Sequence, residues 1–152
     1  MRYRYVVPGR FIDRPNRFIA IVEVDGTDTV CHVKNTGRCK ELLIPGCKVW
    51  LDLSDNPTRK TKYNLICSEK PRENKLPLLI NLDSQIPNDA AGEWLRISSL
   101  FSKDALIRRE YTDGNSRFDF YIEDGERKAF LEVKGVTLEK DGEKIAFITV
   151  CE

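Results

Sequence analysis

The chain has no long apolar run and no recognisable leader. Nowhere in its 152 residues do apolar side chains approach the roughly 18 in succession that a membrane-spanning helix needs. The opening "MRYRYVVPGRF" is too short and too charged for a secretory signal. These absences predict a cytoplasmic protein with no membrane partner. With 41% hydrophobic and 32% charged residues, the chain is expected to be globular rather than disordered.

Histidine is scarce, and cysteine has no metal-binding pattern. His32 is the one histidine, and it lies inside an expected strand, where a structural role is the better interpretation. The five cysteines are odd in number, and none forms a C-x-x-C pair. This pattern argues against both a disulfide framework and a zinc site. We therefore expect buried, reduced thiols.

The net charge of +1 hides an asymmetry between the two halves of the chain. Residues 1–80 hold 15 Lys+Arg and 9 Asp+Glu, so their net charge is +6. Residues 81–152 hold 10 Lys+Arg and 15 Asp+Glu, so their net charge is −5. A basic half attracts a polyanion, and an acidic half can hold a cation. Two solvated surfaces can also differ by chance, so charge alone leaves both interpretations open.

Short strand signals dominate the first half. "RFIAIVEVDG" alternates and ends at Asp25-Gly26, a strong hairpin signal. Its alternate apolar residues share one face: Phe18, Ala20, Val22 and Val24. The segments "TDTVCHVK", "CKVWLDL" and "NLICSE" are further expected strands. Strands at this spacing predict a small barrel with two basic loops, Lys34–Leu43 and Asn56–Tyr63.

The second half changes character after "KPRENKLP" (Lys70–Pro77), which its two prolines and polar residues mark as a linker. Asn88 or Asp89 is expected to cap a helix that runs towards Phe101. Its apolar residues are Ala91, Trp94, Leu95 and Ile97. Gly92 inside this helix costs about 1 kcal/mol relative to alanine. "ALIRREY" is an expected strand.

The stretch "SRFDFYIEDGERKAFLEVKG", residues 116–135, reads as two strands around Asp124-Gly125. A two-residue loop at that pair would place Tyr121 opposite Lys128 and Asp119 opposite Phe130. One face is then wholly apolar and is expected to pack on the helix: Phe118, Phe120, Ile122, Ala129, Leu131 and Val133. The other face carries Asp119, Tyr121, Phe130, Glu132 and Lys134.

The charged residues of that second face predict a site. Asp119 and Glu132 would be diagonal neighbours, about 7–8 Å apart at the backbone. Two such carboxylates can share a divalent cation, Mg²⁺ or Mn²⁺. Lys134 lies about 7 Å further along the strand and can position a water or offset the charge of a phosphate. The three residues predict a phosphodiester-cleaving site; the alternative is a partly solvated strand face with a surface Glu/Lys pair.

Six segments in order along the chain carry a family resemblance: "GRFIDRPNRF", "HVKNTGRCKELLIPG", "RKTKY", "NLDSQIPN", "GNSRFDF" and "EVKGVTLEKDG". From about Gly9 to Gly142 the chain resembles the SfsA family, named for sugar fermentation stimulation. The resemblance implies an α+β protein, with an OB-like β-barrel over residues 1–80 and a PD-(D/E)XK nuclease-like α/β domain over 81–152. It places the acidic pair of that domain at Asp119 and Glu132 and the lysine at Lys134. A glutamate from a helix often joins such sites, and Glu93 is the nearest candidate for this role. The alternative is that Glu93 lies on a solvated helix face.

The resemblance also implies DNA binding and regulation of sugar metabolism genes. OB-type barrels bind nucleic acid through a strand face and loops. Phosphate contacts are expected from Lys34, Arg38, Lys40, Arg59, Lys60 and Lys62. Trp50 and Tyr63 would stack on bases or fill the barrel. Two functions stay open: a DNA-binding protein with a Mg²⁺-dependent phosphodiesterase site, and a non-catalytic DNA-binding regulator. A third and weaker alternative is a truncated family member with no activity.

The C-terminal end departs from the family pattern. Family members usually continue beyond "VTLEKDG", whereas this chain reads "EKIAFITVCE" and stops at Glu152. We therefore expect a nuclease-like domain that is shortened at its C-terminus. Residues 145–150 would add one strand or leave an exposed edge. An exposed edge favours pairing with a second copy, so a homodimer is among the expected assemblies.

Overall fold

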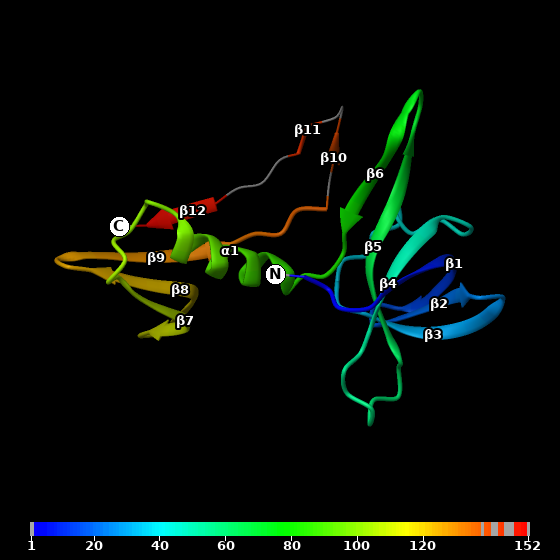
Figure 1. Cartoon of the computed structure of the whole chain (residues 1–152), viewed down its shortest axis with the longest axis horizontal. Helices are drawn as coiled ribbons and strands as arrows, with labels where there is room; N and C mark the ends of the chain where they lie inside the picture. Colours follow the sequence, from blue (N-terminus) through cyan, green and yellow to red (C-terminus); the bar gives the residue numbers. More distant parts are fainter. Residues whose placement is uncertain (1, 138, 141–142, 145–147, 152) are drawn as a thin grey trace. The chain divides into compact units, whose positions relative to one another are not determined.

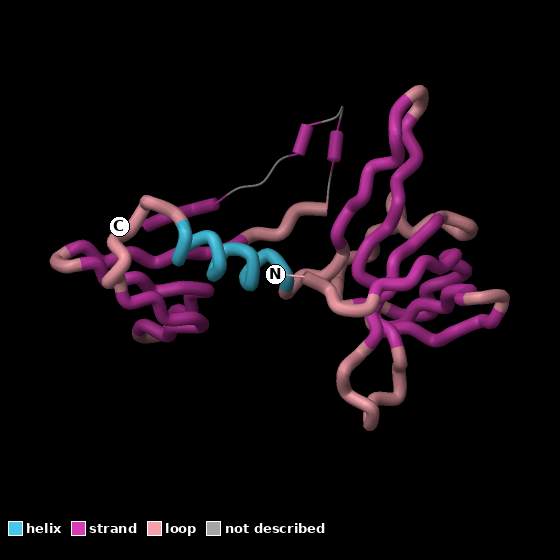
Figure 2. The backbone as a smooth tube through the Cα atoms, in the orientation of Figure 1, coloured by secondary structure: helices cyan, strands magenta, loops and turns pink. Residues whose placement is uncertain are grey.

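The computed structural model describes residues 2–137, 139–140, 143–144 and 148–151. The chain divides into two compact units, Arg2–Ser84 and Gln85–Glu152. Strands and loops make up the described part of the first unit and most of that of the second (Figure 2). The one helix in the described part of the chain, α1 (Ile86–Ile97), is too short to cross a membrane.

The first unit is a curled antiparallel sheet with, among the described residues, six strands: β1 (Val6–Asn16), β2 (Ile19–Val24), β3 (Thr27–Val33), β4 (Lys48–Leu53), β5 (Tyr63–Arg72) and β6 (Lys75–Asn81). Their order is β3-β2-β1-β4-β5-β6 (Figure 1). A parallel pairing of β3 with β5, from Cys31 with Tyr63 to Val33 with Leu65, curls the sheet back on itself. This arrangement agrees with the expected OB-like domain.

The expected hairpin at Asp25-Gly26 is confirmed. Both residues have positive φ, 50° and 76°, as a two-residue turn between right-twisted strands requires. Ala20 and Val22 of β2 are fully buried in the core of the unit. Phe18 was expected beside them but is 50% exposed, because it precedes the first residue of β2.

The expected linker at Lys70–Pro77 is wrong, since this segment forms the turn of the β5–β6 hairpin. Asn74 makes the turn in the left-handed region, with a φ of 53°. Pro71 lies at a register shift between Lys70 and Arg72, and Pro77 lies on an edge strand. Both are positions at which a sheet tolerates a missing N–H, so the prolines do not break the strands.

The second unit packs α1 on a sheet with, in the part of the chain that is described, four strands: β7 (Leu106–Asp113), β8 (Ser116–Asp124), β9 (Arg127–Val133) and β12 (Ile148–Cys151), in the order β12-β9-β8-β7. The short strands β10 (Glu139–Lys140) and β11 (Glu143–Lys144) pair with each other. The strand expected in residues 145–150 is present from Ile148, where it pairs with Val133 of β9. Residues 145–147 lie outside the described residues.

Helix α1 differs from its expected bounds at both ends. It begins at Ile86 rather than after Asn88, with Pro87 in its first turn, where a missing N–H costs nothing. It ends at Ile97, short of Phe101. Leu95 is buried, whereas Trp94 and Ile97 are 45% and 83% exposed.

The core of the second unit lies between α1 and the sheet: Leu95, Phe101, Phe120, Ile122, Ala129 and Leu131. Figure 1 shows α1 beside this sheet. A Cβ at Gly92 would lie 3.2 Å from the Phe120 ring, so glycine permits the close approach of helix and strand. This close packing explains why glycine, which has a low helix propensity, occurs inside α1.

The β8–β9 hairpin has a register that differs from the expected one. Asp124 pairs with Arg127, so the two loop residues are Gly125 and Glu126. Gly125 has a φ of 64° and occupies the first loop position, which type II′ turns reserve for glycine. Tyr121 consequently pairs with Phe130 and not with Lys128. Each residue of β8 thus pairs with a residue of β9 two positions further along than expected. A shift of two residues keeps every side chain of β9 on its expected face of the sheet.

Candidate functional site

Asp119 lies where β8 and β9 separate. Their ladder extends to the pair Phe120–Leu131. Just beyond it, Asp119 Oδ2 accepts a hydrogen bond of 2.7 Å from the backbone N–H of Val133. Its other oxygen, Oδ1, accepts one of 2.7 Å from Nδ2 of Asn88 on α1. The carboxylate is thus held at one position by both a strand and the helix.

The strict alternation expected for β8 is broken next to Asp119. Phe118 was placed with the buried Phe120, but its ring centroid lies 4.5 Å from that of Phe130 on the other side. Tyr111 and Tyr121 stack in the same aromatic group, with centroids 4.5 Å apart. On the neighbouring strand β7, Glu110 lies between two residues that pair regularly with β8 and is itself in the left-handed region, with a φ of 51°. This local irregularity accompanies the turn of Asp119 towards Asn88.

Glu132 and Lys134 form a salt bridge at the end of β9, with Lys134 Nζ donating to Glu132 Oε1. The hydrogen bond to Glu132 is the main cause that raises the pKa of Lys134. The negative charges of Glu132 and Asp119 raise this pKa further. Val133, whose N–H binds Asp119, stands between Glu132 and Lys134 in the chain, so the three residues expected to form the site lie near one another.

The donor set of this site is small. No group of three or more His, Cys, Asp or Glu side chains suited to a metal is present within the described residues. Asp119 and Glu132 can therefore supply two carboxylates, to which water and a phosphate oxygen would have to be added. Glu93 is exposed on α1 and lines a separate hollow with Arg96 and Arg109.

Two of the six basic residues expected to contact DNA are already engaged within the protein. Lys34 Nζ lies 2.8 Å from Oδ2 of the buried Asp83. Arg59 donates to Ser54 Oγ, Asn64 Oδ1 and Thr61 Oγ1 and so holds its own loop together.

The other four basic residues are exposed: Arg38, Lys40, Lys60 and Lys62. Lys62 Nζ lies 5.2 Å from the centre of the Tyr63 ring. Trp50 Nε1 donates to Glu69 Oε1, and Lys48 lies over the ring at 4.6 Å. The rings of Trp50 and Tyr63 thus each carry a lysine on one face.

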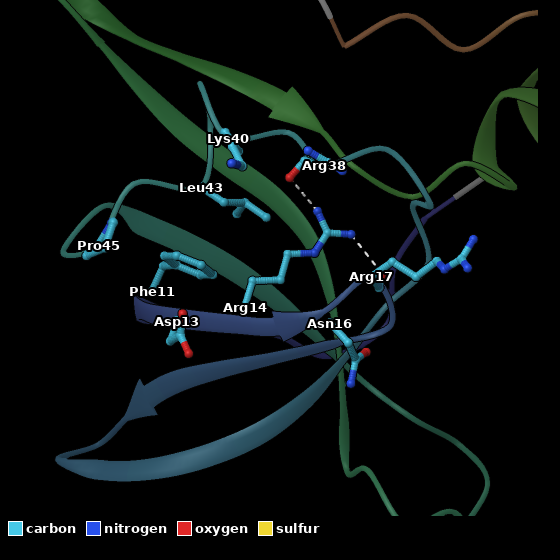
Figure 3. A pocket seen from close by; sticks show the side chains of 9 residues that line it. All are labelled: Phe11, Asp13, Arg14, Asn16, Arg17, Arg38, Lys40, Leu43 and Pro45. Atoms are coloured by element: carbon cyan, nitrogen blue, oxygen red, sulfur yellow. Dashed lines mark hydrogen bonds between the residues drawn. The ribbon is translucent and has the colours of Figure 1, made fainter.

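A pocket of about 390 Å³ lies in the first unit between the end of β1 and the β3–β4 loop (Figure 3). We call it the Arg14 pocket, and its lining residues are Phe11, Asp13, Arg14, Asn16, Arg17, Arg38, Lys40, Leu43 and Pro45. Sequence reasoning found Arg38 and Lys40 but missed Arg14 and Arg17. The local pattern of the segment "FIDRPNRF" does not reveal a link to a loop 21 to 24 residues away.

Arg14 organises this pocket through backbone contacts. Nη1 donates to the carbonyl oxygens of Gly37 and Arg38, both at 2.7 Å. Nη2 donates to those of Asn35 and Arg17, at 2.6 and 2.8 Å. One guanidinium therefore fixes the β1–β2 turn and the β3–β4 loop to each other.

Comparison with known proteins gives the same family match for both units. The model described as "SfsA N-terminal OB domain" matches residues 12–76, and the model described as "Sugar fermentation stimulation protein RE domain" matches residues 85–147. Proteins named "Sugar fermentation stimulation protein homolog" are 54% identical in Desulfitobacterium hafniense (strain DSM 10664 / DCB-2) and 52% in Clostridium beijerinckii (strain ATCC 51743 / NCIMB 8052), over 142 residues.

These alignments cover 93% of this chain and 60% and 61% of the two relatives, so the chain spans about 60% of their length. A solved structure, "The structure of Pyrococcus Furiosus SfsA in complex with Ca2+", is similar with a TM-score of 0.69 and 25% identity. That match covers 84% of this chain and 53% of the Pyrococcus chain.

Proposed function

The chain belongs to the sugar fermentation stimulation protein (SfsA) family, and from this premise we propose that it binds DNA and carries a metal-dependent phosphodiesterase site. The observation that supports this best is the grouping of Lys134 with two carboxylates where β8 and β9 separate. A fixed carboxylate, a second carboxylate and a lysine are the parts that hydrolysis of a phosphodiester needs.

Asp119 and Glu132 would hold Mg²⁺ or Mn²⁺ in this proposal. Each carboxylate oxygen has two lone pairs, so the hydrogen bonds to Asp119 leave it able to act as a ligand. The Pyrococcus furiosus relative was solved in complex with Ca²⁺, a hard cation, which supports the proposal that this chain binds a cation of the same class. When bound, the cation would activate a water and offset the charge of the phosphate.

Lys134 would act directly on the substrate. Its salt bridge with Glu132 links two half-exposed side chains, so rearrangement of this pair costs little. If Glu132 held a cation, the Lys134 ammonium would be free to contact a phosphate oxygen or to orient the attacking water. The ammonium is charged at neutral pH with or without the Glu132 partner, as both tasks require, because the ordinary pKa of lysine is about 10.4.

The phosphate backbone of DNA would contact the exposed basic residues of the first unit. Arg38, Lys40, Lys60 and Lys62 are exposed and suit this role, whereas Lys34 and Arg59 have protein partners. Such contacts supply affinity without sequence preference and release counterions.

A second candidate function is a non-catalytic DNA-binding regulator. Its support is the two-carboxylate donor set within the described residues, together with the ion pair that already engages Lys134. In this case the charged group would be a retained surface feature, and all activity would reside in DNA binding.

Single-turnover cleavage of a labelled DNA mixture at saturating Mn²⁺ separates the two functions. If the site is catalytic, Lys134→Ala should lower the cleavage rate at least tenfold, or about 1.4 kcal/mol, at nearly unchanged DNA affinity. Lys128→Ala removes an exposed lysine from the same strand and serves as the matched control. Cleavage that survives Lys134→Ala contradicts the assigned role. Intact DNA binding without any cleavage supports the regulator.

DNA binding itself is tested by fluorescence anisotropy between 50 and 200 mM salt, a range over which phosphate contacts lose affinity steeply. Lys60→Ala and Lys62→Ala should each weaken binding of all sequences alike and lower the salt slope by about 1. Lys75→Ala, an exposed lysine in the β5–β6 hairpin, should leave the slope unchanged. Affinity that does not vary with salt would contradict DNA binding through this surface.

A further inference from the structure

The Arg14 pocket combines a cationic rim with a single acidic side chain. Four of its lining residues are cationic, and only Asp13 carries a carboxylate. Its volume of about 390 Å³ lies within the roughly 300–1,000 Å³ typical of small-molecule sites. The pocket is therefore large enough and charged enough for an anion that carries an attached ring.

The positive charge at this rim exceeds the single negative charge of Asp13. Arg14 donates to four carbonyl oxygens and not to a carboxylate, so it keeps its full charge. Within the described part of the chain, the exposed side chains of Arg38 and Lys40 take part in no salt bridge. An anion that enters the pocket would meet three cations whose charge is still available.

The floor of the pocket is apolar. Phe11 and Leu43 belong to the core of the first unit, and Figure 3 shows them side by side, with Pro45 next to them and Arg14 alongside. Phe11 and Leu43 are only 2% and 6% exposed, so the accessible part of the floor is the exposed Pro45 with the edges of these two side chains. A flat, apolar ring can lie against it, and aromatic and apolar side chains are the usual platforms for nucleobases.

We propose that the Arg14 pocket binds one nucleotide unit. Its phosphate contacts Arg38 and Lys40 at the rim, and its base lies on the apolar floor. The carboxylate of Asp13 then accepts a hydrogen bond from an amino or imino group of the base. A phosphate alone has no such N–H donor.

The polar groups of the pocket favour a nucleotide over a phosphorylated sugar. A sugar presents many hydroxyls, each of which needs a hydrogen-bond partner when it is buried. Asn16 is the uncharged polar side chain of the lining, and its Oδ1 already accepts from the backbone N–H groups of Phe18 and Ile19. The apolar floor offers such hydroxyls no partner, and Asn16 keeps only its Nδ2 as a donor, so burial of several hydroxyls would be unfavourable.

Two sources can supply this ligand: a free mononucleotide, or one unpaired unit of a DNA strand. The second source rests on the proposed DNA binding, and the first does not. The two are separated by comparing thymidine 5′-monophosphate with a short oligodeoxythymidine.

Isothermal titration calorimetry on the full 152-residue chain tests the proposal. Thymidine 5′-monophosphate should bind at least tenfold more tightly than inorganic phosphate, thymidine or glucose 6-phosphate. The variant Arg38→Ala/Lys40→Ala should weaken this binding at least tenfold. Arg14 contacts the carbonyl oxygen of Arg38 and not its side chain, so the substitutions leave the frame of the pocket intact. Lys75→Ala, which removes an exposed charge elsewhere in the unit, is the matched control.

The proposal is overturned if thymidine 5′-monophosphate does not bind, if glucose 6-phosphate binds as tightly, or if the double variant and Lys75→Ala behave alike. DNA binding that persists in those cases leaves the proposed function standing. Conversely, mononucleotide binding without binding of oligodeoxythymidine or duplex DNA supports the pocket and contradicts the DNA-binding function.

Discussion

Lys34 and Asp83 form an ion pair, with 2.8 Å between Nζ and Oδ2, that joins the start of the β3–β4 loop to the segment after β6. The side chain of Asp83 is fully buried, and that of Lys34 is 25% exposed. Ser84 Oγ donates to the carbonyl oxygen of Lys34 beside this pair. Lys34 therefore stabilises the first unit, whatever it contributes to binding.

Loss of this lysine should destabilise the fold. Lys34→Ala removes the Nζ that pairs with the buried Asp83 carboxylate and is expected to lower the free energy of unfolding by about 3 kcal/mol. Asp83→Asn in the Lys34→Ala background should recover part of this loss, because it removes a buried charge that has lost the Lys34 partner. Urea denaturation of the single and double variants measures the effect. A loss below about 1 kcal/mol for Lys34→Ala would contradict this account.

Asp119→Asn should abolish metal binding with little effect on the fold. The remaining amide oxygen can still accept from Val133 N–H, and the Asn88 amide can reverse to accept from the new NH₂ group. We expect a stability within about 1 kcal/mol of the parent. Mn²⁺ should raise the melting temperature of the parent by mass action and not that of the variant. An equal rise in both proteins would place the metal elsewhere.

Asp124 should contribute to stability in a pH-dependent way. Hydrogen bonds from the Ser102 hydroxyl and backbone N–H lower its pKa. Since the folded pKa lies below the unfolded value of about 3.9, this stability is present above that value and is lost as the pH falls through the folded pKa. Ser102→Ala should flatten the loss of stability between pH 4 and pH 2, as followed by urea denaturation. Identical pH profiles of the two proteins would argue against the interaction.

Cys31 should resist alkylation in the folded protein. Burial raises the pKa of its thiol to about 12, and at pH 8 only about one molecule in 10⁴ then carries the reactive thiolate. Burial likewise raises the pKa of Cys67 to about 11. Iodoacetamide should label Cys31 at least 100-fold faster in urea than under native conditions, as read by mass spectrometry. Rapid labelling of the native protein at Cys31 would contradict the buried position.

Much of the β structure could be predicted, because its signals are local. The Asp25-Gly26 turn depends on two adjacent residues that tolerate positive φ, and alternating apolar residues in β2 place Ala20 and Val22 inside. The β8–β9 hairpin was found but its register was not. Asp124-Gly125 and Gly125-Glu126 are both acceptable loops by local chemistry, and the carboxylate of Asp124 is instead held by Ser102, 22 residues away.

The sequence by itself determined the family, the mainly β character of the chain and the residue types grouped around Lys134, because these depend on motifs and short-range periodicity. Only the tertiary structure decided which charges are free. Lys34 is paired with a residue 49 positions away, and Arg14 binds carbonyl oxygens up to 24 positions away. A charged side chain finds such partners only when the strand order brings distant segments together, and no local propensity encodes that order. For the same reason the Arg14 pocket, built from β1 and the β3–β4 loop, has no signature in the sequence.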